Sequence, residues 1–76
     1  MTEKTVNINT PFIKLDQLLK FSALAESGAD AKDMILSKSV DVNGYLCTMR
    51  GKKIRPGDNV TVEFEDETVV LNVGEE

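Results

Sequence analysis

The chain has 76 residues, of which 41% are apolar and 29% are charged, and its formal charge is -4. This length and ordinary globular composition predict one domain over 1–76 and exclude an intrinsically disordered chain. Because histidine is absent and Cys47 is the only cysteine, an internal disulfide, a zinc site of Cys and His ligands and a Ser-His or Cys-His catalytic pair are excluded. We therefore expect no catalytic residue, no metal and no cofactor.

The sequence also bears on location and partners. Its first residues show no basic segment followed by an apolar run, and no stretch approaches the roughly 20 apolar residues that cross a bilayer. Neither of the common glycine-rich nucleotide-binding motifs is present. We expect a cytoplasmic monomer that is not an enzyme and has neither a membrane nor a small-molecule substrate as its partner.

The first half of the chain predicts a strand followed by two helices. Residues 5–9 alternate polar and apolar side chains, as in a short strand, and Pro11 ends this run. From Phe12 the apolar spacing becomes helical, with a predicted buried stripe of Leu15, Leu18, Leu19 and Ala23. A second helix should begin after Ser27, a good N-cap residue, and bury Ala31, Met34 and Ile35.

The second half predicts antiparallel strands. Val40–Val42 leads into Asn43-Gly44, a strong signal for a type I′ hairpin turn, and residues 45–48 should return as the partner strand. A basic loop and an Arg55-Pro56-Gly57-Asp58 turn follow. Two further strands are predicted on either side of a polar turn at 65–67, with alternating apolar residues Val60, Val62, Phe64 and then Val69, Leu71, Val73. This order predicts an α+β fold.

The charge is unevenly distributed along the chain. The span 14–55 holds eight cations and five anions, whereas 56–76 holds seven anions and no cation. Several cations lie in the basic loop or outside the predicted apolar helix stripes, and the N-terminus of the second helix adds backbone donors at Ser27. Such groups suit a phosphodiester chain. The candidate RNA-binding residues are Lys14, Lys20, Ser27, Lys32, Arg50, Lys52, Lys53 and Arg55.

Aromatic residues are scarce, with three Phe and one Tyr, and the Phe residues are expected in the core. A platform for stacking single-stranded bases is therefore not expected. Recognition of a structured RNA by its shape and phosphates fits the composition better.

Three motifs resemble a known family: "IKLDQLLKFSALAESGADAKDMI", then "VDVNG", then "RGKKIRPGD". In this order they resemble the ribosomal-protein-S-four RNA-binding domain, or αL RNA-binding motif, most closely its short stand-alone bacterial members of the YaaA or YbcJ type. The resemblance covers about residues 12–62, and an acidic hairpin follows at about 58–76. It implies two packed helices followed by a small antiparallel sheet, and binding of structured RNA, with ribosomal RNA as the family expectation.

The resemblance implies RNA contacts at the basic positions of both helices and of the loop, namely Lys14, Lys20, Lys32, Arg50, Lys52, Lys53 and Arg55. The chain departs from the family at three places. Gly28 and Asp41 occupy positions that are often basic, which weakens the basic face. Ser39 occupies a position just past the second helix that is usually Gly, where positive φ would suit Gly better.

Two alternative functions compete with RNA binding. A ubiquitin-like sulfur carrier can also show V-N-G followed by P-G-D, but it needs a C-terminal Gly-Gly, whereas this sequence ends Val73-Gly74-Glu75-Glu76. A protein-docking module could use the acidic hairpin from Asp58 to Glu76, but a solubilising acidic surface is the simpler interpretation of these residues.

Overall fold

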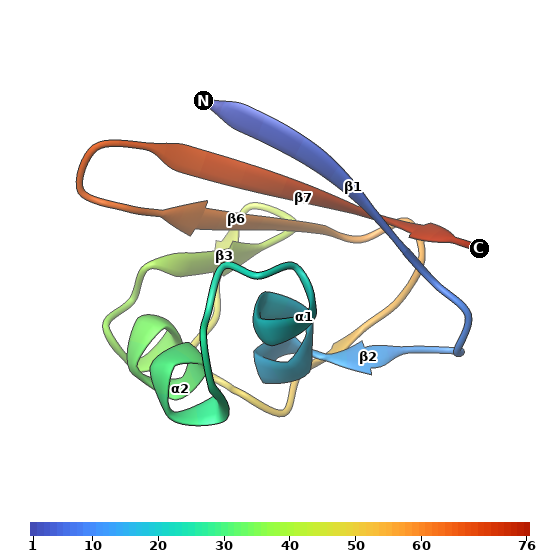
Figure 1. Cartoon of the computed structure of the whole chain (residues 1–76), viewed down its shortest axis with the longest axis horizontal. Helices are drawn as coiled ribbons and strands as arrows, with labels where there is room; N and C mark the ends of the chain where they lie inside the picture. The colour runs from blue at the N-terminus through green and yellow to red at the C-terminus, as the bar shows by residue number, and fades with distance from the viewer.

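Two helices cover one face of a five-stranded sheet in the computed structural model, which describes residues 1–76 (Figure 1). The elements in chain order are β1 (Thr2–Ile8), β2 (Ile13–Lys14), α1 (Leu15–Phe21), α2 (Gly28–Leu36), β3 (Val40–Val42), β4 (Tyr45–Leu46), β5 (Lys53–Ile54), β6 (Asn59–Glu63) and β7 (Thr68–Glu75). The sheet order is β1-β7-β6-β3-β4, and β2 and β5 form a separate antiparallel pair. The predicted α+β fold with two packed helices is confirmed.

The N-terminal strand gives the sheet a mixed character that the sequence did not predict. β1 pairs in parallel with β7, from Thr2 opposite Val69 to Ile8 opposite Glu75, whereas the other pairs are antiparallel. A parallel pair needs a long crossover connection, and here the helices and the remaining strands provide it. Period-two alternation reveals a strand but not its partner, so this pairing could not be read from residues 5–9.

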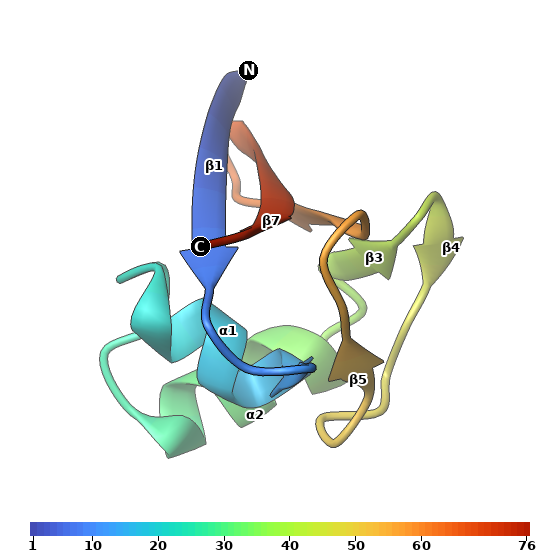
Figure 2. The same cartoon turned by 90° about the vertical axis from the view of Figure 1, so that its right-hand side faces the viewer.

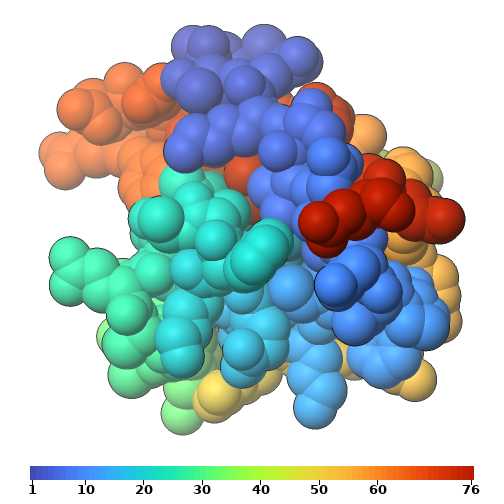
Figure 3. All heavy atoms as spheres, turned by 45° about the vertical axis from the view of Figure 1, so that its right-hand side comes forward, coloured from blue at the N-terminus to red at the C-terminus, as the bar shows by residue number.

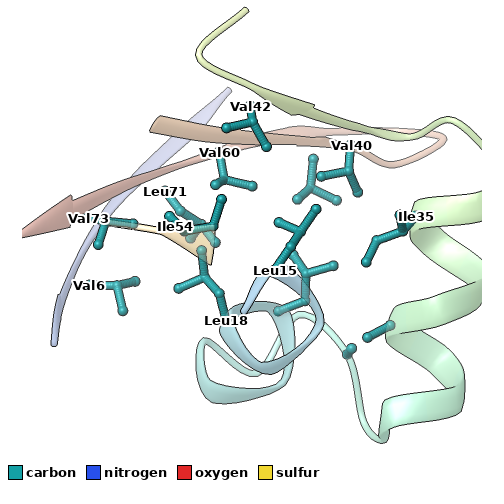
Figure 4. Packing of buried hydrophobic residues seen from close by; sticks show 14 of the residues in the cluster. Val6, Leu15, Leu18, Ile35, Val40, Val42, Ile54, Val60, Leu71 and Val73 are labelled. Carbon is teal, nitrogen blue, oxygen red and sulfur yellow. The ribbon is translucent and has the colours of Figure 1, made fainter. Parts of the chain in front are cut away.

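The core lies between the sheet and the helices (Figure 4). Alternate residues of the strands point toward the helices, and Val60 and Leu71 are completely buried there. Leu15 and Leu18 of α1 meet them from below in this view and Ile35 of α2 from the right, also with 0% exposure. Each such side chain contributes roughly 1.5–3 kcal/mol through burial of apolar surface.

None of the three Phe residues belongs to this core, contrary to the expectation from sequence, and Phe12 is only partly buried. Phe21 is the last residue of α1 and is 64% exposed. Phe64 lies beyond the end of β6, where its N–H donates to the carbonyl of Glu67 (2.7 Å), and it is 39% exposed. The alternation of apolar residues predicts a strand that includes Phe64, whereas β6 ends at Glu63.

The predicted turns are confirmed. Asn43 and Gly44 have φ of 52° and 85°, as a type I′ turn requires. Gly57 has φ of 99°, and the N–H of Asp58 donates to the carbonyl of Arg55 (3.0 Å) to close the second turn. No helix of the structure is long and apolar enough to span a membrane.

α1 ends sooner than its apolar spacing predicted. Ala23 is exposed instead of buried, and its φ is 65°. Its N–H donates to the carbonyl of Lys20 (3.1 Å), and the N–H of Leu24 donates to that of Leu19 (3.0 Å). This is the Schellman arrangement, in which a left-handed residue, usually Gly, follows the helix.

α2 ends in the same arrangement, with Lys38 at φ of 65°. The N–H of Lys38 donates to Ile35 (3.2 Å), and that of Ser39 donates to Met34 (3.4 Å). The family resemblance placed the position that favours glycine at Ser39. The structure places it one residue earlier, at Lys38.

Ala23→Gly is expected to raise the free energy of unfolding by about 0.5–1 kcal/mol. A left-handed conformation costs an L-residue roughly 1–2 kcal/mol, part of which the extra entropy of unfolded Gly offsets. Urea denaturation measures the change. Ala29→Gly within α2 is the matched control and should lower stability, because φ is helical there. Equal losses in both variants would contradict the assignment.

Candidate nucleic-acid interface

The basic loop, residues 49–55, is fastened to the N-terminal end of α1. The N–H of Leu15 donates to the carbonyl of Lys52 (2.9 Å), and the N–H of Asp16 donates to that of Arg50 (3.1 Å). The first amides of a helix have no partner within the helix, and Lys14 at the N-cap supplies no side-chain acceptor. Loop carbonyls therefore take the role of a capping side chain. Figure 2 shows the resulting proximity of α1, β5 and the loop.

An ion pair strengthens this attachment. The Nε of Arg50 donates to Oδ2 of Asp16 at 3.2 Å, and Oδ1 of Asp16 accepts from the N–H of Gln17 at 2.8 Å. Asp16 is only 8% exposed, whereas half of the Arg50 side chain reaches solvent. Sequence analysis missed Asp16, since a lone carboxylate in the first helical turn normally signals only helix stability. Arg50 thus helps to hold the loop in place.

Two lysines face each other across the β2–β5 pair. Lys14 is directly opposite Lys53, and the adjoining pair, Ile13 and Ile54, anchors the two strands in the core. The Nζ of Lys53 also lies 4.9 Å from the centre of the Phe12 ring, a cation–π contact. Like charges directly opposite in a strand pair destabilise it by about 0.2–1 kcal/mol. A bound anion between them would relieve this repulsion.

The structure brings together only part of the predicted set. Lys14, Arg50, Lys52 and Lys53 meet at the start of α1, and we call these four residues the cation cluster. Arg55 is exposed on the turn that follows β5, and Lys20 is exposed on α1, where it lines a small hollow with Gln17 and Phe21.

Lys32 and Ser27 lie on α2, and no polar contact joins either of them to the cation cluster. Lys32 is exposed. The hydroxyl of Ser27 accepts from the N–H of Asp30 (3.2 Å), as predicted for an N-cap. The Asp30 carboxylate in turn accepts from the N–H of Glu26 (3.0 Å), which puts a negative charge beside the amides that had suggested a phosphate site. The proposed contacts of Ser27 and Lys32 with RNA stay predictions.

Asp58 fixes the far end of the basic loop. Its Oδ2 accepts from the N–H of Arg55 (2.8 Å) and its Oδ1 from the amide of Asn43 (3.1 Å). The hydrogen bond from Arg55, then that from Asn43 and the charges of Arg55 and Lys52, hold the pKa of Asp58 below its ordinary value of 3.8, although burial opposes them. The carboxylate thereby connects the Asn-Gly turn to the Pro-Gly turn.

The acidic residues of the β6–β7 turn lie away from the cation cluster. Glu65, Asp66 and Glu67 occupy the tip of this hairpin, which Figures 1 and 2 place at the end of the molecule opposite to the basic loop. The charge asymmetry of the sequence is thus also an asymmetry in space. No group of three or more Cys, Asp or Glu side chains is arranged to hold a metal ion.

A model of the S4 domain family matches residues 6–71. The chain belongs to the S4 domain family. S4 domains are RNA-binding modules, so the cation cluster belongs to a chain of an RNA-binding family. No curated protein matches the sequence significantly.

Among solved structures, this S4 domain is similar to the trimeric Heat Shock Protein 15 of Vibrio cholerae, with a TM-score of 0.75 and 17% sequence identity. The match covers 86% of this chain but 65% of the other, just under two thirds of its length. At this identity the likeness shows the fold alone.

Arg50→Gln is expected to lower the free energy of unfolding by about 1 kcal/mol, because it leaves the Asp16 carboxylate without its charged partner; the half-exposed guanidinium limits the loss. Lys52→Gln is the matched control and should change stability little, since Lys52 joins the attachment through its carbonyl. Urea denaturation of both variants tests this. Equal stability of the two would show that the ion pair does not hold the loop.

Asp58 should make stability depend on pH in the acid range. Its folded-state pKa lies below the ordinary value of 3.8, so the ionised carboxylate stabilises the fold above that pH, and this contribution is lost as the pH falls through the folded-state pKa. Asp58→Asn should therefore be less stable than the wild type at neutral pH, with the difference shrinking under acid conditions. Asp66→Asn on the exposed hairpin turn is the control, and thermal unfolding across pH is the measurement. A constant difference between wild type and Asp58→Asn would contradict the assignment.

Proposed function

We propose that this S4 domain is a non-catalytic module that recognises structured RNA, such as ribosomal RNA, through its helices and basic loop. It acts in the cytoplasm as a monomer and a single RNA-binding domain over 1–76, with a family-like core at about 12–62 and the acidic hairpin at about 58–76. The proposed contacts are Lys14, Lys20, Ser27, Lys32, Arg50, Lys52, Lys53 and Arg55.

The cation cluster carries this proposal. Its members come from two segments of the chain that the backbone bonds of Leu15 and Asp16 hold side by side. Lys14 and Lys53 are opposed even though their repulsion weakens the free protein. In a loop that is only solvated, this repulsion has no compensation. A bound phosphate chain compensates for it, because its charges interact with several neighbouring cations.

Several features support a structured RNA over an extended strand. Recognition of double-stranded regions depends on shape and on phosphate and sugar contacts. The backbone of the cluster is fixed by β2, α1 and β5, so its cations start from defined points on the surface before RNA arrives. Non-specific single-strand binders instead carry rows of aromatic residues, and this chain has only four in total. Nothing in the structure favours the sulfur-carrier or protein-docking alternatives.

Affinity for an RNA stem-loop should fall steeply with salt. If about four phosphates are neutralised, log affinity against log salt should have a slope near -3, from ~0.7–0.9 per contact. Titration at several salt concentrations measures the slope, and an unstructured RNA of equal length should bind more weakly. Affinity that does not change with salt, or a preference for the unstructured RNA, would refute the proposal.

Lys14→Gln separates binding from folding in the same assay. It should weaken binding and reduce the salt slope by about one contact, yet leave the free protein as stable or slightly more stable, since it removes the repulsion from Lys53. Neutralising Glu65, Asp66 and Glu67 together is the control and should leave binding unchanged or slightly stronger, because it removes only distant repulsion. If the acid variant loses binding and Lys14→Gln does not, RNA binds at the acidic hairpin turn and not at the cation cluster, and the proposed interface is wrong.

A further inference from the structure

A hollow of about 450 Å³ lies between the edge of the sheet and the basic loop. Its walls include Tyr45, Leu46, Thr48, Met49 and Lys52. This volume is within the range of small-ligand sites, which extend from ~300 to ~1,000 Å³. No residue proposed above for RNA binding lines it except Lys52, so most of this hollow has no role in the proposed interface.

Exposed side chains with large apolar parts line the hollow. Tyr45 is 79% exposed, Leu46 54% and Met49 65%. Tyr45 is opposite Val42, whose side chain is buried on the helix side of the sheet, so Tyr45 extends that same face beyond the edge of β3. The phenol ring therefore lies on the side of the sheet where the basic loop runs.

The surroundings of the hollow favour a partner that is both flat and anionic. Lys52 is its only charged lining residue and belongs to the cation cluster. Met49 and Lys52 are the two ends of one turn, closed by the Lys52 N–H and the Met49 carbonyl (3.1 Å). An RNA chain whose phosphate contacts Lys52 therefore passes beside Met49 at the other end of the same turn, where the apolar surface begins. The Thr48 hydroxyl has no hydrogen-bond partner in the structure and can serve a base edge.

Other occupants fit less well. An added peptide strand would find an edge of only two residues, Tyr45 and Leu46, and the next amide, Cys47, already donates to Val40 (3.0 Å). A second hollow, of about 550 Å³, lies between α1 and the C-terminal segment (Figure 3), but Glu76 lines it together with Lys14. That carboxylate disfavours a nucleotide there.

We propose that the hollow beside β4 receives one unpaired nucleobase of the RNA, stacked on Tyr45, while Lys52 holds an adjacent phosphate. This rests on the proposed RNA-binding function and extends it from phosphates and shape to a preference for an unpaired nucleotide. Stacking on an aromatic ring tolerates any base, so the preference is for an unstacked base and not for a sequence.

Tyr45 allows a direct test, because it is the only tyrosine and the chain has no tryptophan. The intrinsic tyrosine emission of the protein therefore reports on this hollow alone. The probes are a two-stranded RNA duplex with one unpaired adenosine in one strand and the same duplex with that nucleotide deleted. We expect the first to bind about tenfold more tightly and to quench the emission, and the second to bind with little quenching.

Variants complete the test. Tyr45→Phe should keep the preference, and Tyr45→Ala should remove it while binding the fully paired duplex normally; folding should tolerate both at a side chain this exposed. Lys52→Gln should weaken both duplexes equally. If both duplexes bind alike with salt-dependent affinity and unchanged emission, this inference is overturned while the proposed function stands. If neither binds, both fail. An emission change that follows protein concentration without RNA would identify a second copy as the occupant and also overturn it.

Discussion

The attachment of the basic loop to the first turn of α1 determines the arrangement of the rest of the interface. The amides of Leu15 and Asp16 must find acceptors, and they find them in the loop and not in a capping side chain. One requirement of the backbone therefore fixes both the start of the helix and the path of the loop. Every lysine and arginine around that junction takes its position from it, and the ion pair between Asp16 and Arg50 adds side-chain bonding at the same place.

This arrangement concentrates more positive charge at the junction than the ion pair with Asp16 neutralises. Lys14 and Lys53 stand opposite each other with no acidic partner, so an incoming anion would lower the electrostatic energy of the site. In return, the loop backbone does not have to be ordered when RNA binds, because its hydrogen bonds to Leu15 and Asp16 already hold it. The acidic hairpin at the other end keeps the net charge of the protein negative without neutralising the site.

The features that the sequence predicted are those that depend on neighbouring residues. Turn chemistry at Asn43-Gly44 and the N-cap at Ser27 are decided within a few residues, and the structure has both. The features that were missed depend on distant partners. Asp16 has meaning only once Arg50 is beside it, and the parallel pairing of β1 can be assigned only once β7 is known. Phe21 was misplaced because its residue type was given more weight than its place on α1, which lies off the buried stripe of Leu15, Leu18 and Leu19.

The parallel pairing of β1 with β7 also constrains the order in which the protein is assembled. β1 is synthesised first, yet its partner strand follows only about 60 residues later, which takes several seconds at roughly 5–20 residues per second on the ribosome. Throughout that interval Val6 and Ile8 have no sheet to join, and the nascent chain exposes them. Closure by β1 is a contact of very long sequence separation and should come late and slowly. Until it happens, β7 is an open edge at which two partly folded copies could pair wrongly.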